Sequence, residues 1–122
     1  MAKSEDKALT KNARVRVYET TISLLAAMYS ELQDLAKKKP DATLNAAKVK
    51  MVNRLLTDLR EVVADEPQLK YLDLLDDADL PQYSDVVLIL SQYVGAMTAF
   101  RSRYYHNDYK TMDDRWFTEE KP

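Results

Sequence analysis

The sequence predicts an all-α fold on two observations. One glycine and four prolines leave little material for the tight turns of a β-sheet protein. Apolar residues recur at alternating steps of three and four along long segments, which is the spacing of a helical face. We therefore expect one helical domain over residues 1–122, built as a bundle of three long helices. A short helix should lie between the second and third, and residues 110–122 should form an irregular C-terminal tail.

The composition is that of an ordinary soluble domain, with 46% hydrophobic and 31% charged residues. The absence of cysteine excludes disulfides and thiolate chemistry and fits a cytoplasmic location. We see neither a signal peptide nor an apolar run of about 20 residues, so no membrane partner is expected. The net charge of −2 hides a basic zone over residues 37–54, with six cations against one acid, and an acidic zone over residues 58–85, with nine acids against two cations.

The first long helix is expected over about residues 13–39, with residues 1–12 frayed or extending it. One face carries a continuous apolar seam made of Val15, Tyr18, Ile22, Leu25, Tyr29, Leu32 and Ala36. Three further apolar residues widen it, namely Leu24, Met28 and Leu35. The wide seam predicts contact with two neighbouring helices, and Pro40 stops the helix.

The second long helix is expected from Leu44 to about Asp65, capped by Asp41 or Thr43. Its broad apolar face is made of Leu44, Met51, Val52, Leu55, Leu56, Leu59, Val62 and Val63. The connection over residues 39–43 is short, so the first two helices should pack antiparallel as a hairpin.

The segment after the second helix is broken at Glu66-Pro67 and then becomes acidic. Residues 68–75 can form a short helix with Leu69, Leu72 and Leu75 turned inward. A calcium loop would need alternating acids around a glycine, and no glycine lies here. A solvated acidic turn is therefore expected.

The third long helix is expected within residues 84–109, capped by Ser84 or Asp85. Its apolar seam covers residues 86–104, and the opposite side carries mostly small residues around Gly95. A mid-helix glycine costs about 1 kcal/mol relative to alanine, so another backbone should approach closely there. We expect that approach within the bundle, with a second subunit as the alternative.

Trp116-Phe117 is a large apolar pair in the charged tail. It either folds back onto the bundle or docks on a partner protein, and the sequence leaves both open. Together with Gly95 and Tyr105, this pair makes up the candidate protein-interaction residues.

Few residues suit catalysis or metal binding. One glycine cannot build a phosphate loop, and one histidine leaves no metal site or nucleophilic triad, so no cofactor or metal is expected. Arg101 and His106 have the R-x4-H spacing of HEPN ribonucleases, in which the pair acts on an RNA phosphodiester. The alternative is an exposed histidine near a helix C-terminus.

Arg101 and Arg103 also belong to a basic-aromatic cluster with Tyr104, Tyr105 and Tyr109. Cations on phosphates and rings against bases suit nucleic-acid strands. The alternative is that Tyr104 completes the apolar seam while the arginines are solvated or paired with acids.

Two segments carry a family resemblance: Leu44-Asn-Ala-Ala-Lys48-Val49-Lys50, and Tyr93-Val-Gly-Ala96-Met97-Thr-Ala99-Phe100 followed by Tyr104 and Asp108. They resemble the small subunits of CRISPR effector complexes, of the type III Csm kind or its type I counterpart. The resemblance implies a non-catalytic helical bundle that stacks in copies and supports guide–target pairing. It implies that Lys48 and Lys50 bind phosphate, and charge and position add Arg54, Arg101 and Arg103.

We therefore expect a non-catalytic small subunit of an antiviral nucleoprotein complex, which contacts RNA or DNA backbone and copies of itself or other subunits. The alternatives are a helical protein-binding module, such as a phage- or plasmid-encoded inhibitor or adaptor, and a HEPN-like ribonuclease. Salt-dependent binding without sequence preference would separate the first from the second.

Overall fold

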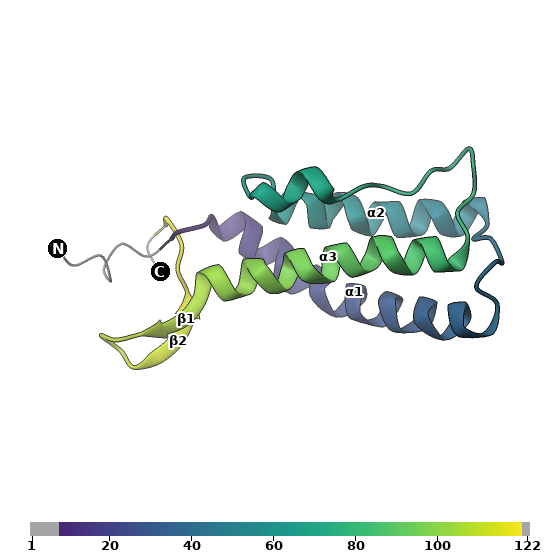
Figure 1. Cartoon of the computed structure of the whole chain (residues 1–122). Helices are drawn as coiled ribbons and strands as arrows, with labels where there is room; N and C mark the ends of the chain where they lie inside the picture. Colours follow the sequence, from purple (N-terminus) through teal and green to yellow (C-terminus); the bar gives the residue numbers. More distant parts are fainter. Residues whose placement is uncertain (1–7, 121–122) are drawn as a thin grey trace.

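The computed structural model of the chain describes residues 8–120 and confirms the all-α prediction (Figure 1). Three long helices pack together, namely α1 (Asn12–Lys38), α2 (Ala46–Val62) and α3 (Tyr83–Tyr104). A 3-10 helix, η2 (Pro67–Tyr71), precedes α3, and two short strands, β1 (Tyr105–Asp108) and β2 (Asp113–Trp116), follow it. No helix in this part of the chain is long and apolar enough to cross a membrane.

The core lies between the three helices, and α1 contacts both α2 and α3 along its length (Figure 1). The predicted seam of α3 is fully buried, from Val86 through Leu90, Tyr93, Met97 and Phe100 to Tyr104. Most of the predicted face of α2 is buried as well, but Met51 is 48% exposed. The short connection between α1 and α2 places them side by side as the predicted hairpin.

The predicted helix caps are wrong: α2 begins later than expected and is capped by another side chain, and at α3 backbone groups of another segment take the place of a side-chain cap. Leu44 is buried, and its N–H donates to the carbonyl of Pro81 at 2.9 Å, so α2 begins two residues later. Asn45 caps α2 instead, accepting from the Lys48 N–H at 2.9 Å. At the start of α3 no side chain caps the helix, and the N–H groups of Tyr83 and Ser84 donate to carbonyls of the α1–α2 connection.

The predicted short helix over residues 68–75 is only partly present. It ends at Tyr71, and the chain then runs extended over α2 and α3. Side chains of those helices bind the backbone of this extended segment. The Asn53 side chain of α2 accepts from Leu75 N–H at 2.8 Å and donates to Leu75 C=O at 2.9 Å. The Tyr93 hydroxyl of α3 donates to Asp73 C=O at 2.8 Å. Leu72 and Leu75 are buried as predicted.

The prediction of an irregular tail is wrong, because residues 105–116 form an antiparallel hairpin. Tyr105 pairs with Trp116 at its base and Asp108 with Asp113 at its tip. The Asp108 carbonyl accepts from Met112 N–H at 2.7 Å, and Met112 takes the positive φ of 62° that the turn requires. The helix expected within residues 84–109 therefore ends at Tyr104.

The tail after the hairpin closes against the residues before α1. Thr10 forms a parallel bridge with Thr118, held by hydrogen bonds of 3.1 and 2.8 Å. The Glu120 carboxylate accepts from Asn12 N–H at 3.1 Å, which supplies the cap that α1 lacks at Lys11. Of the N-terminal residues expected to fray or extend α1, residues 1–7 lie outside the described part of the chain.

Gly95 lies on the exposed face of α3, so the predicted close approach of another backbone within the bundle is wrong. A Cβ built at this position meets no atom within 4 Å. The reason is that the buried seam of α3 faces α1 and α2, and Gly95 points away from both. Contact with a second subunit remains a prediction.

Candidate nucleic-acid and protein interfaces

The five cations predicted to bind nucleic acid lie at opposite ends of the bundle. Lys48 and Lys50 lie in the first two turns of α2, beside its connection to α1, and Arg54 follows at the middle of the helix. We call these three residues the α2 cations and this end of the bundle the connection end (Figure 1). Arg101 and Arg103 lie in the last turn of α3, next to β1 and β2, at the hairpin end. The structure therefore does not bring these five residues together into one site.

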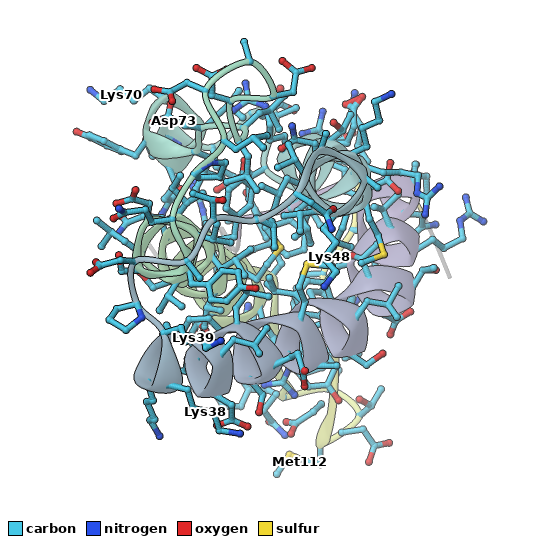
Figure 2. All side chains as sticks on the ribbon, turned by 90° about the vertical axis from the view of Figure 1, so that its right-hand side faces the viewer. Lys38, Lys39, Lys48, Lys70, Asp73 and Met112 are labelled. Carbon is cyan, nitrogen blue, oxygen red and sulfur yellow. The ribbon has the colours of Figure 1, made fainter. Side chains whose placement is uncertain are left out.

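The connection end carries a concentration of exposed positive charge. Lys37, Lys38 and Lys39 close α1 there, and all three are exposed, as are the α2 cations. Figure 2 looks onto this end and shows Lys38 and Lys39 at the end of α1, with Lys48 between α1 and α2. Within residues 8–120, no ion pair involves any of these six cations.

Arg103, at the hairpin end, is neutralised by an acid from another segment. Its guanidinium pairs with the Glu66 carboxylate at 2.9 Å, and the Glu66 side chain is only 7% exposed. The same carboxylate accepts from the Tyr104 hydroxyl at 2.6 Å. Burial and this hydrogen bond raise the pKa of Tyr104 to about 12. Arg103 therefore anchors Glu66 and is poorly placed to bind phosphate.

Arg101 and His106 are not displayed on one helical face, as the ribonuclease hypothesis supposed. His106 lies beyond the end of α3, in β1, and its ring stacks on Phe117 with centroids 4.2 Å apart. Its Nδ1 is buried, and no hydrogen-bond partner for it lies in the described part of the chain. Arg101 instead lies over the Tyr105 ring at 4.4 Å. This packing favours a structural role for His106.

Trp116 and Phe117 fold back onto their own bundle, which decides between the two alternatives for the tail. Trp116 contacts the rings of Tyr18, Phe100 and Tyr105 at centroid distances of 5.2, 5.7 and 5.2 Å. Its Nε1 also donates to the Glu19 carboxylate at 3.2 Å. Phe117 is buried, and Tyr105 is half-buried between Arg101 and Trp116. These aromatic side chains hold the hairpin in place and do not form a free docking surface.

A groove that the sequence reasoning missed runs between α1 and α2, with a volume of about 780 Å³. Its floor is apolar, made of Leu32, Leu44, Val52 and Leu55. Leu24 from α1 and Met51 from α2 lie on its two walls and are 55% and 48% exposed. The signal for it was the width of the apolar stripe on α1, which exceeds what α2 and α3 cover.

Acidic side chains lie on the other side of the connection end, where Asp73, Asp76, Asp79 and Asp85 line a polar hollow beside the start of α3. Within residues 8–120, no group of three or more histidine or carboxylate side chains is arranged to hold a metal ion. No family model, no curated protein and no solved structure matches this chain.

Proposed function

We propose that this protein is a non-catalytic helical subunit of a nucleoprotein complex, of the CRISPR effector kind, which binds nucleic-acid backbone at its connection end. One observation carries the proposal: six cations on the neighbouring parts of α1 and α2 are exposed, and none of them pairs with a carboxylate among the described residues. A cation that binds a phosphate displaces a counterion condensed on the nucleic acid. The release of these counterions is the main source of non-specific affinity for nucleic acid.

The surroundings of these cations favour an anion on one side of the bundle. The N-terminus of α2 lies at the connection end, and the positive end of its dipole adds to the field of Lys48 and Lys50. The negative end of the α1 dipole lies at the same end and is offset by Lys37 and Lys38 in the last turn of α1. The acidic hollow lined by Asp73, Asp76 and Asp85 repels phosphate from the α3 side. A strand bound at this end would therefore follow the α1–α2 side, with no base-specific contact required.

Binding of a labelled single-stranded RNA or DNA, measured by fluorescence anisotropy, tests the proposal. We expect affinity to fall steeply between about 50 mM and about 200 mM salt. The double variant Lys50→Glu, Arg54→Glu should bind at least about tenfold more weakly, with a salt slope reduced by about two, because each phosphate contact contributes about one.

A matched control reverses two exposed cations at the hairpin end, Arg16→Glu with Arg101→Glu. Its net charge equals that of the connection-end variant, but its affinity should stay close to that of the wild type. An equal loss of affinity in both double variants would show that binding follows net charge and has no site at the connection end. Absence of salt-sensitive binding by the wild type, alone or in its purified complex, would refute the proposal.

A further inference from the structure

The groove between α1 and α2 leaves large apolar side chains in solvent on both of its walls. Leu24 and Met51 are each about half exposed there, above a floor of buried leucine and valine. Scattered apolar residues are normal on a surface, whereas apolar side chains gathered along one groove offer another apolar surface a place to bind. A phosphate backbone would gain nothing from such a floor, so this surface suits a protein partner.

The shape of the groove suits one α-helix. The wall from α1 runs from Thr20 to Leu35, which at 1.5 Å per residue is about 22 Å, or four helical turns. A helix of about 15 residues with apolar side chains at every third or fourth position would lay that face along it. Met28 and Met51 line the groove, and their unbranched side chains can adjust to the shape of an inserted residue.

The charges that line the groove give the bound helix a direction. Lys48 lies at the connection end of the groove, and Asp58 lies ten residues further along α2, toward the hairpin end. Midway, Glu31 lies on the α1 wall and Arg54 on the α2 wall. A helix presents its negative end at its C-terminus and its positive end at its N-terminus. Its C-terminus therefore fits over Lys48 and its N-terminus near Asp58.

We propose that this groove binds one amphipathic helix of a partner protein, with carboxylates in the last turns of that helix lying near Lys48 and cations in its first turns lying near Asp58. The bound helix runs parallel to α1 and antiparallel to α2. The two proposals share Lys48 and Arg54, which line the groove and belong to the exposed cations. The apolar residues that carry this proposal, Leu24 and Met51, have no part in phosphate binding, so the two proposals can fail separately.

Two synthetic peptides of the same composition test the proposal by fluorescence anisotropy. The first is an amphipathic helix with leucines along one face, lysines in the first turn and glutamates in the last turn. The second exchanges the lysines and glutamates, which makes it the better isolated helix, because its charges suit its own dipole. We expect the first to bind at least about fivefold more tightly, and helicity alone would give the opposite order.

Variants on the two walls locate the binding. Leu24→Glu and Met51→Glu each place a charge against the apolar face of the peptide, and each should weaken binding by about thirtyfold or more. Leu88→Glu is the matched control, because Leu88 is 64% exposed on α3 and lies outside the groove. Lys48→Glu should reverse the preference between the two peptides, which a loss of folding would not do. Circular dichroism checks the fold of each variant.

Several results would overturn the proposal. They are equal weakening by Leu88→Glu, no preference between the two peptides, and no binding of the first peptide at millimolar concentration. Self-association of the wild type that Met51→Glu abolishes would make a second copy of this chain the occupant. The RNA affinity of the Leu24→Glu variant separates the two proposals. This affinity should match that of the wild type, so loss of peptide binding can be distinguished from loss of RNA binding.

Discussion

The two ends of the bundle use their positive charges in different ways. At the hairpin end, Arg103 pairs with the nearly buried Glu66 and Arg101 lies over the Tyr105 ring. At the connection end, six cations are exposed, and among residues 8–120 none has an acidic partner. The difference shows that cations predicted to share one role are not equally available to a ligand. An acid 37 residues away decides what Arg103 does.

The hairpin end should be the more sensitive of the two to mutation, and Trp116→Ala is expected to have the largest effect. The substitution removes ring contacts to Tyr18, Phe100 and Tyr105 and should lower the free energy of unfolding by about 3 kcal/mol. Urea denaturation measures the change. Met112→Ala is the control, since Met112 is 70% exposed at the hairpin tip, and its effect should stay below about 0.5 kcal/mol. Similar values for the two variants would show that the hairpin does not stabilise the bundle.

An intermediate effect is expected when the acid that pairs with Arg103 is removed. Glu66→Ala deprives both Arg103 and the Tyr104 hydroxyl of their acceptor and should cost about 2 kcal/mol. Arg103→Ala should cost about 1 kcal/mol, whereas Lys50→Ala at the connection end should change stability by less than about 0.5 kcal/mol. Equal costs for Arg103→Ala and Lys50→Ala would remove the contrast between the two ends.

A pH-dependent effect is expected from titrating Tyr104 at high pH. Its pKa is raised to about 12 in the folded protein from 10.0, so the folded state holds this proton more tightly than the unfolded state. The resulting stabilisation is complete below pH 10 and is lost as the pH rises toward 12. Tyr104→Phe removes it, so the difference in unfolding free energy between wild type and variant should shrink over this range. A constant difference would contradict the assignment.

The sequence predicts the helices well because their signal is local. The apolar seams of α1 and α3 recur at helical steps, and the helices begin and end within a few residues of the expected positions, apart from the C-terminal end of α3. The predicted caps are wrong because hydrogen bonds to distant backbone groups decide where the helices begin, as when Leu44 N–H binds the Pro81 carbonyl. The hairpin could not be predicted because β1 and β2 have no alternating apolar pattern. Its position depends on Trp116 packing against Tyr18, which lies near the other end of the sequence.

The candidate sites follow the same division. Exposure of Lys50 and Arg54 could be expected from their shared place on the polar face of α2, and both are exposed in the structure. That Arg103 is neutralised, and that the Gly95 position is open, could not be seen without the partner segments. The groove could be predicted only in part. Leu24 and Met51 widen the apolar faces of their helices in the sequence, but the packing of the helices decides that both side chains stay exposed between α1 and α2.

The closure of residues 117–120 onto the start of α1 also has a consequence for the order of events during synthesis. The Glu120 carboxylate that caps Asn12 lies 108 residues further along the chain. Of the three helices, α1 is therefore synthesised before α2 and α3 but is the last to have its opening turn completed. Until then, the Asn12 N–H lacks this acceptor. A nascent chain halted before Trp116 would hold its three helices without the segment that closes them, and a protease would meet the frayed start of α1 first.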